Sequence, residues 1–443
     1  MASWIKKHRD TLLVAFLWSL VGAGIVFRLI NPFFNNPNDF LQSDPLRHFL
    51  SARECLPTIH ENWTACEIID PLGYQFWLTT ILRITAADRV ATAIYAGALS
   101  ILNTWFWYQW MKLCVGNKNL ALAGYAVLSV LPDWTRVFQY YLQETLVLPL
   151  VGLSLWLSWA TMKNPSSAKY VGTGLAWGCA LLTKITALPM ATVVFAWMIF
   201  KNSPNLRKPD LRNLKLPLVA LAICLVVYAL GPIKIFNRIH AFVLIPGGDY
   251  HRACYESGND NMKCTFKFQD IRQGNQVYEI EAGPPSLDLR LPVPFEWKTT
   301  RKGLCLTEAD FTASPFNYYP PSRMSFQDRL HYTWENIIYF FFGLSWPENT
   351  DTRYFGIFCE MMKSSRFIWL PITLAIIFLI VKKRRVDIMS VLFLVSLSFF
   401  MLQQSVIMEA RYKKAWEGIA VATLFALLAN RKIRNKERTS ELS

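Results

Sequence analysis

The sequence predicts an all-α polytopic membrane protein, a bundle of about 10–12 transmembrane helices with external interfacial helices and a loop-rich external segment. The composition is the first reason, because 53% of the 443 residues are hydrophobic and only 17% are charged, whereas a soluble protein usually has about 25% charged residues. The second reason is that the apolar residues fall in long blocks. The third is that basic residues cluster beside these blocks, as in the cytoplasmic loops of membrane proteins.

The net charge of +15 would also suit a nucleic-acid-binding protein. The basic clusters, however, flank apolar runs; they are Lys6-Lys7-His8-Arg9, Lys201, residues 207–215, residues 382–385 and residues 431–438. The positive-inside rule explains this placement and puts both termini on the cytoplasmic side. We therefore expect membrane lipids, and no nucleic acid, as partners.

About ten segments are expected to span the membrane. In chain order they are residues 11–30, 90–111, 120–131, 145–161, 171–182, 187–200, 216–236, 367–381, 388–403 and 416–428. The first lacks a small-residue cleavage site after it, so it is expected to be a retained helix and not a signal peptide. The inward-running spans end beside lysines such as Lys112 and Lys163. Two shorter aromatic pieces, residues 72–85 and 332–346, are expected to be interfacial helices.

Three parts follow from this order of segments. Residues 1–236 are expected to form an N-terminal transmembrane catalytic module with an external loop at 31–73. Residues 237–330 are expected to form an external loop-rich segment. Residues 331–443 are expected to form a C-terminal part of interfacial and transmembrane helices with a basic cytoplasmic tail. Six cysteines fall in external segments, where disulfides such as Cys55 with Cys66 or Cys254 with Cys264 can form. The other three, Cys114, Cys179 and Cys224, fall in or near spans.

Six stretches of this chain stand in the order found in a known superfamily. They are Ser43-Asp44-Pro45, Asp70-Pro71-Leu72-Gly73-Tyr74, Tyr140-Tyr141-Leu142-Gln143-Glu144-Thr145-Leu146, Leu181-Leu182-Thr183-Lys184-Ile185-Thr186-Ala187-Leu188, Gly231-Pro232-Ile233-Lys234-Ile235-Phe236-Asn237-Arg238 with residues 242–248, and Glu409-Ala410-Arg411-Tyr412. With them the chain resembles the GT-C membrane glycosyltransferases, in particular the branch of protein O-mannosyltransferases and aminoarabinose transferases. The chain lacks the paired acids that the protein-mannosylating members have in the first loop, and Tyr140 and Tyr141 stand where many relatives have an arginine.

The resemblance implies a GT-C-type inverting glycosyltransferase that uses a polyprenyl-phosphate-linked sugar as its donor. Asp44 would be the general base that takes the proton of the acceptor hydroxyl. Its alternative role is that of a helix N-cap, since Asp before Pro is a common helix start. Glu144 would be a second carboxylate that orients the acceptor or a metal, or else an ordinary acid at a helix N-terminus.

Several cationic and aromatic side chains are candidates for binding the donor. Lys184 is the sharpest, because it falls on the outer side against the positive-inside bias, between two apolar helices. The other substrate-binding candidates are Arg47, His48, Arg53, Tyr74, Arg238, His251 and Arg411. The basic ones among them could instead reach toward anionic headgroups, and Arg411 could form a structural ion pair with Glu409. Asp133 and Arg136 are expected to be a local loop pair.

No cofactor is expected apart from the lipid-linked donor. The six histidines show no zinc-type spacing, so no metal site is assigned, although an external acid pair with a histidine would suit a divalent ion. No Rossmann fingerprint or phosphate-binding glycine loop points to a soluble nucleotide sugar.

Two other functions compete with the transferase. One is a transporter or flippase of a lipid-linked anion, and the other is a receptor that displays the segment 237–330. The candidate residues share the outer or luminal face, in a bacterial inner membrane or in the endoplasmic reticulum. The acceptor, whether glycan, lipid or protein, is left open.

Overall fold

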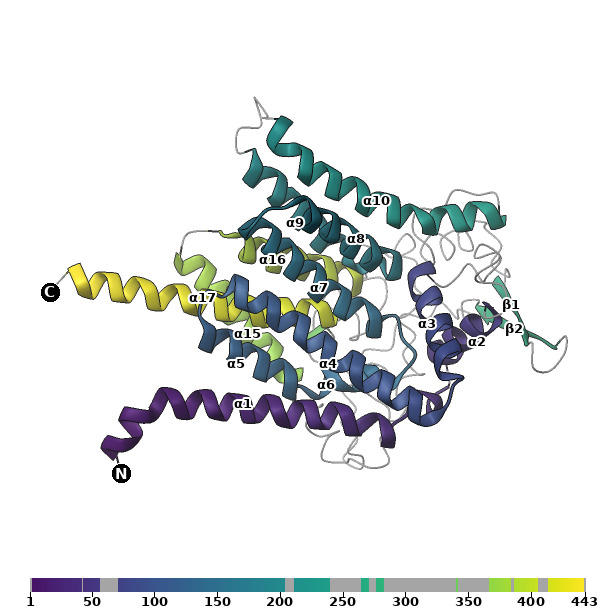
Figure 1. Ribbon diagram of the computed structural model, residues 1–443, viewed down its shortest axis with the longest axis horizontal. Helices are drawn as coiled ribbons and strands as arrows, with labels where there is room; N and C mark the ends of the chain where they lie inside the picture. The colour runs from purple at the N-terminus through teal and green to yellow at the C-terminus, as the bar shows by residue number, and fades with distance from the viewer. Residues whose placement is uncertain are drawn as a thin grey trace, which may run out of the picture.

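The computed structural model describes residues 2–41, 43–55, 71–203, 211–239, 264–270, 276–282, 340–341, 366–383, 386–404 and 413–441. These residues form a helical bundle with the helix axes running roughly along its long dimension (Figure 1). The predicted all-α polytopic membrane fold is confirmed. Beside the helices lies a single described hairpin of two antiparallel strands, β1 (Cys264–Asp270) and β2 (Gln276–Ala282), with Cys264 opposite Ala282.

The helices follow one another in the predicted order. They are α1 (Ala2–Phe34), α2 (Ser43–Cys55), α3 (Leu72–Thr85), α4 (Arg89–Cys114), α5 (Lys118–Val130), α6 (Pro132–Arg136), α7 (Glu144–Lys163), α8 (Ser167–Thr183), α9 (Leu188–Asn202), α10 (Leu211–Ile239), α15 (Trp369–Lys383), α16 (Ile388–Gln404) and α17 (Lys414–Glu441). Short 3₁₀ turns are η1 (Pro37–Asp39), η2 (Val137–Gln139), η3 (Ile185–Ala187) and η6 (Arg366–Ile368).

Each of the expected spans coincides with one of these helices. They correspond to α1, α4, α5, α7, α8, α9, α10, α15, α16 and α17. Within the described ranges, five helical segments are long and apolar enough to cross a membrane by themselves: Asp10–Asp39, Arg89–Cys114, Glu144–Lys163, Ile185–Asn202 and Asn213–Lys234. Helices α5, α8, α15 and α16 are shorter, with 13 to 17 residues, so their place in a membrane depends on packing against these five.

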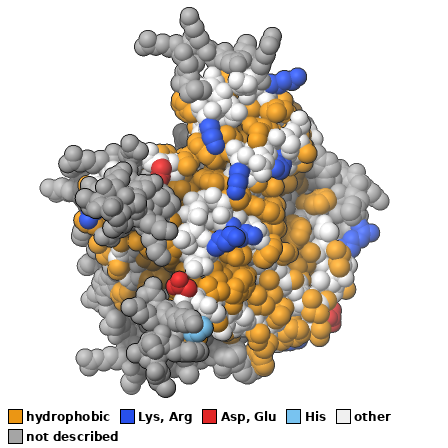
Figure 2. Space-filling view, turned by 60° about the vertical axis from the view of Figure 1, so that its left-hand side comes forward, with side chains coloured by type: hydrophobic (Ala, Val, Ile, Leu, Met, Phe, Trp, Pro, Cys, Tyr) orange, Lys and Arg blue, Asp and Glu red, His pale blue; other side chains and the backbone are white. Residues whose placement is uncertain are grey.

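The two ends of the bundle differ in character. Both chain termini lie at one end, and α2, α3 and the hairpin lie at the other (Figure 1). Lys112, Lys163 and Lys201 occupy the last turns of α4, α7 and α9, the helices that run toward the terminal end. Figure 2, in which that side comes forward, shows Lys and Arg side chains distributed among hydrophobic ones. The bundle thus has a basic end and an opposite end that holds the short helices.

The breaks between helices have local causes. Asp88 caps α4 by accepting a hydrogen bond from the backbone of Ala91, and Asn117 caps α5 in the same way. Helix α5 stops at Val130 because Leu131, which precedes Pro132, adopts an extended conformation. A new helix, α6, then begins with Pro132 at its first position. The chain therefore bends at the end of α5 before it reaches Asp133.

Arg28 of α1 binds the backbone that this bend exposes. Its guanidinium, which is fully buried, donates to the carbonyl oxygens of Leu128 at 2.8 Å and Trp134 at 2.9 Å and to the hydroxyl of Ser100 at 2.6 Å. The last carbonyls of a helix have no partner within the helix, so Arg28 supplies donors from a neighbouring helix. It thereby fixes α6 against α1 and α4.

Replacing Arg28 with Met is expected to lower the melting temperature clearly, because at least two buried carbonyls lose their donor, at a cost of about 1–3 kcal/mol for each unsatisfied group. Arg28→Lys should lie between wild type and Arg28→Met, since an ammonium keeps the charge but cannot span three acceptors with a planar fork. Thermal unfolding in detergent measures both. A melting temperature of Arg28→Met equal to that of the wild type would contradict this role.

Candidate functional site

The site is centred on an ion pair between Glu144 and Lys184. Glu144 is the first residue of α7 and is 3% exposed. Lys184 follows α8 in an extended conformation (φ −161°, ψ 125°), so the chain breaks there before η3 and α9. The ammonium group of Lys184 donates to Oε1 of Glu144, and both side chains are largely shielded from solvent. Two residues 40 positions apart in the sequence thus meet where three helices begin or end.

A pocket opens beside this pair. Its polar wall consists of Glu144, Lys184, Thr186 and Lys414, and its apolar wall of Val147, Leu148, Val151, Met190 and Ala415. Lys414 begins α17, so the pocket joins the N-terminal helices to the C-terminal part of the chain. Two ammonium groups and one carboxylate therefore face a space with an aliphatic side. The space is small, about 10 Å³, which is room for about one water molecule, so a larger ligand would have to widen it.

Lys414 is held by two acids on its other side. Its ammonium group lies 3.2 Å from Oδ2 of Asp133 and 3.5 Å from Oε1 of Glu417, all of them buried. The indole of Trp134 donates to Oε2 of Glu417 at 3.0 Å. Asp133 is therefore paired across the bundle with α17, which the expectation of a local pair with Arg136 did not include. Burial of these charges is tolerated because each contacts an opposite charge.

Helix α2, which contains Asp44, rests on α3. The imidazole of His48 packs edge-on against the ring of Tyr74, with centroids 5.1 Å apart, and both side chains are buried. The hydroxyl of Thr79 donates to the carbonyl of Ala52 at 3.1 Å. These contacts place His48 and Tyr74 within the interface between the two helices.

A buried lysine of α10 takes part in the same interface. Lys234 donates to Oε1 of Gln75, and Nε2 of Gln75 donates to the hydroxyl of Ser51 at 2.8 Å. Since an ammonium group can only donate, Lys234 fixes which end of the Gln75 amide faces α2. Helices α10, α3 and α2 are therefore joined by one chain of hydrogen bonds.

Gly73 allows α3 to approach the end of α8. A Cβ atom at this position would lie 2.9 Å from the backbone nitrogen of Thr183 and 2.9 Å from the carbonyl carbon of Leu182. Backbone atoms cannot move aside as a flexible side chain can, so only glycine fits. The close approach brings α3 next to the residue that precedes Lys184.

Gly73→Ala is expected to destabilise the protein by about 1–3 kcal/mol, the usual cost of overpacking a tight contact. Gly22→Ala is the matched control, because nothing lies within 4 Å of a Cβ added at Gly22 of α1, and alanine is the better helix former by about 1 kcal/mol. The melting temperature of Gly73→Ala should fall, while that of Gly22→Ala should rise or stay unchanged. Equal changes would contradict the tight contact at Gly73.

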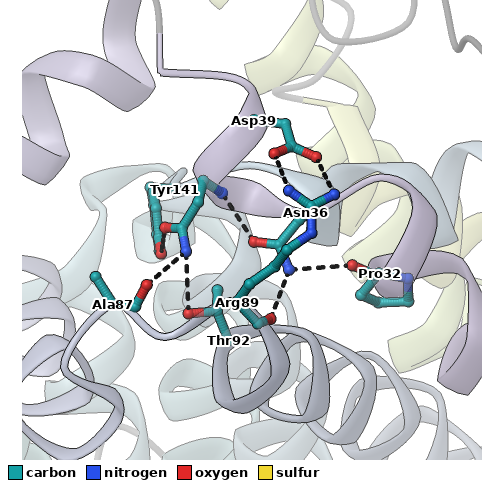
Figure 3. A network of polar contacts seen from close by, with 8 residues as sticks. Pro32, Asn36, Asp39, Ala87, Arg89, Thr92 and Tyr141 are labelled. Carbon is teal, nitrogen blue, oxygen red and sulfur yellow. Dashed lines mark hydrogen bonds and ion pairs between the residues drawn. The ribbon is translucent and has the colours of Figure 1, made fainter.

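The chain between α1 and α2 is clamped onto α4. Asn36 donates to the carbonyl of Arg89 at 2.8 Å, and the carboxylate of Asp39 forms two hydrogen bonds with the Arg89 guanidinium, one of them 2.7 Å long (Figure 3). Asn38 donates to the carbonyl of Ala87 at 2.9 Å. The turn η1 is therefore fixed five residues before α2 begins.

The remaining candidates are placed less completely. Asp44 and Arg47 lie in α2, whose backbone is described but whose side chains at these positions are outside the described part. Asp44 is the second residue of α2, in its first turn. Arg53 lies in the last turn of α2 and is half-buried. The structure does not describe the side chain of Arg238, at the end of α10, or residues His251 and Arg411.

Four cysteines have a described state. Cys55, the last residue of α2, is disulfide-bonded, and the described Cys114, Cys179 and Cys224 are free thiols. Over the part of the chain that is described, no three His, Cys, Asp or Glu side chains gather as metal ligands.

Three buried lysines, Lys234, Lys413 and Lys414, were not among the sequence-based candidates. Lys414 follows the stretch with Glu409 and Arg411, which was expected to be external, and Lys234 lies within an apolar span. Both stand against the positive-inside bias, which is the signal that singled out Lys184. The same test applied to every lysine beside a span would have found them.

One comparison with known proteins gave a match. Residues 70–230 match the family model described as dolichyl-phosphate-mannose-protein mannosyltransferase. No curated protein and no solved structure matches the chain significantly. The matched region runs from the start of α3 to α10 and includes Gly73, Glu144 and Lys184. Over residues 70–230, the chain is therefore similar to the dolichyl-phosphate-mannose-protein mannosyltransferases, a family of the GT-C superfamily of membrane glycosyltransferases.

Proposed function

We propose that this protein is an inverting glycosyltransferase that moves a sugar from a polyprenyl-phosphate donor to an acceptor hydroxyl. The observation that carries the proposal is the pocket in which the Glu144–Lys184 pair and Lys414 face an aliphatic wall. A polyprenyl-phosphate sugar has the matching character, with a charged phosphate between an apolar chain and a sugar. The family match supports a lipid-linked sugar as donor.

The phosphate of the donor would bind the ammonium groups of Lys184 and Lys414. The polyprenyl chain would lie along Val147, Val151 and Met190. A lysine provides a compact charge that holds a phosphate oxygen without imposing a planar geometry. Because both ammonium groups are already paired with acids of the protein, they are held in place before the donor arrives, and no large reorganisation is needed as charge develops.

The reaction would be a single displacement at the anomeric carbon. The Asp44 carboxylate accepts the proton of the acceptor hydroxyl, and the hydroxyl oxygen forms a bond with the anomeric carbon. The bond between that carbon and the phosphate oxygen breaks, and its electron pair remains on the departing polyprenyl phosphate. Lys184 and Lys414 then stabilise the phosphate as its negative charge increases. The sugar reaches the acceptor with inverted configuration.

The site would lie at the outer or luminal face of the membrane. The basic end of the bundle carries the chain termini and the lysines that close α4, α7 and α9. By the positive-inside rule this end is cytoplasmic. The pocket residues Glu144 and Lys184 stand at the ends of α7 and α8 that lie away from this basic end. The segment 237–330 is proposed to select the acceptor.

Purified protein in proteoliposomes, supplied with radiolabelled dolichyl-phosphate mannose and a membrane extract as acceptor, tests the proposal. The expected result is transfer of label to extract components together with release of dolichyl phosphate. The anomeric configuration of the product, determined by NMR, should be opposite to that of the donor. A folded protein that leaves the label on dolichyl phosphate, with this donor and with other polyprenyl-phosphate sugars, would overturn the proposal.

A further inference from the structure

Tyr141 connects the two chain segments that carry the candidate acids. It lies in the link between η2 and α7, three residues before Glu144, and its side chain is buried. Its hydroxyl donates a hydrogen bond of 2.6 Å to Oδ1 of Asn38. Its ring packs against Phe49 of α2, with centroids 5.6 Å apart and an interplanar angle of 33°. One side chain thus contacts α2 directly and also the turn that leads into it.

Asn38 can accept from Tyr141 because its amide nitrogen is already committed to α4. That nitrogen donates to the carbonyl of Ala87 at 2.9 Å and lies 3.5 Å from the hydroxyl oxygen of Thr92 (Figure 3). The amide of an asparagine has one donor end and one acceptor end. With the donor end toward α4, the acceptor end faces Tyr141.

The turn between α3 and α4, whose Ala87 carbonyl accepts the hydrogen bond from Asn38, is itself strained. Ala86 and Ala87 have φ angles of 50° and 56°, in the left-handed region that residues with a side chain rarely adopt. The hydroxyl of Thr85 accepts from the backbone of Ala87 at 3.3 Å, and Asn38 holds the Ala87 carbonyl from the other side. Two strained residues persist only where the surroundings fix them. The position of Asn38 is thus well determined.

The phenol of Tyr141 remains a donor at physiological pH. Burial raises the pKa of Tyr141 to about 12, so the hydroxyl keeps its proton. The hydroxyl therefore remains able to donate to Asn38 at neutral pH.

We propose that Tyr141 is a positioning residue for sugar transfer, which sets the place of α2 and its Asp44 relative to the first turn of α7 and its Glu144. The role of Asp44 in this statement rests on the proposed function. Asn38 stands six residues before Asp44 and Tyr141 three residues before Glu144, so their hydrogen bond is a short link between the two acids. The ring contact with Phe49 fixes α2 one turn beyond Asp44.

The first test is amide hydrogen exchange of the Tyr141→Phe variant in nanodiscs, read by mass spectrometry. The variant keeps the ring on Phe49 and loses only the hydroxyl, so it is expected to fold. Amides of residues 35–55 should exchange about 2- to 10-fold faster than in the wild type, the factor that corresponds to one net hydrogen bond. Tyr108→Phe is the matched control, because Tyr108 stacks on Tyr125 far along α4 from Arg89; it should leave residues 35–55 unchanged. Unchanged exchange in Tyr141→Phe overturns the proposal.

The second test is steady-state transfer from dolichyl-phosphate mannose. We expect kcat of Tyr141→Phe to fall about 10- to 100-fold, because a small misplacement of reacting groups is costly, while KM for the donor changes less than about twofold, because its phosphate ligands are intact. Faster exchange with an unchanged kcat, or a loss confined to KM, overturns the positioning role. If the wild type transfers no sugar, the proposed function fails, and the exchange experiment still decides whether Tyr141 holds α2.

Discussion

Asp44→Asn is expected to reduce the rate of sugar transfer by about 10²- to 10⁴-fold, the usual contribution of a positioned general base. Asparagine has nearly the same size and shape as aspartate but cannot take a proton from the acceptor. Asp44 lies in the first turn of α2, the helix that His48, Ser51 and Ala52 fasten to α3. The measurement is kcat with a saturating polyprenyl-phosphate sugar, normalised to folded protein.

The alternative role of Asp44 predicts a different result. An acid in the first turn of a helix contributes about 0.3–1 kcal/mol through the helix dipole. If Asp44 did only this, Asp44→Asn would lower the melting temperature slightly and leave kcat unchanged. Asp387→Asn is the matched control, since Asp387 accepts from the backbone and hydroxyl of Ser390 at the start of α16. It should show the small stability effect without loss of transfer.

Lys184→Met is expected to impair both folding and transfer. Combining it with Glu144→Gln in a double variant separates the two effects. Removing the lysine alone leaves the Glu144 carboxylate buried without its closest cation, which costs about 3–5 kcal/mol. Removing both charges in the double variant Glu144→Gln/Lys184→Met should restore most of the melting temperature, because a buried pair can be replaced by neutral residues at little cost. The double variant is nevertheless expected to bind polyprenyl phosphate about 10- to 100-fold more weakly, since it lacks one charge-assisted hydrogen bond.

The recovery of the double variant decides what the pair does. If the pair only supports the fold, the double variant should regain sugar transfer together with thermal stability. If the pair holds the donor, the double variant should regain thermal stability alone. Lys201→Met controls for loss of a lysine at the basic end of the bundle, where α9 closes, and should change neither quantity. Melting temperature and donor binding, measured on the same preparations, distinguish the two outcomes.

The order of helices could be predicted from the sequence because each span is marked locally. An apolar run of sufficient length and a lysine at its inner end identify α4, α7 and α9, and Pro132 marks the break after α5. The special status of Lys184 was also predictable, since a lysine between apolar helices, at the end opposite to the basic clusters, departs from the charge rule. These inferences need only the neighbouring residues.

The pairing of the polar residues could not be predicted in the same way. The contacts of Lys184 with Glu144, Lys414 with Asp133 and Lys234 with Gln75 join residues 40, 281 and 159 positions apart. Helices that are apolar on all sides carry no periodic signal of which face meets which neighbour. Partners across such helices follow only from their packing, which is why Lys414 and Lys234 were found in the structure and not in the sequence.

The most direct test of the account is a cryo-EM map of the protein in nanodiscs that contain polyprenyl phosphate. We expect density for a phosphate group within hydrogen-bonding distance, about 3 Å, of the ammonium groups of Lys184 and Lys414, with the lipid chain along Val151 and Met190. The same density should be absent from the Glu144→Gln/Lys184→Met variant. A bound polyprenyl phosphate located elsewhere, with this pocket empty, would contradict the assignment of the donor site.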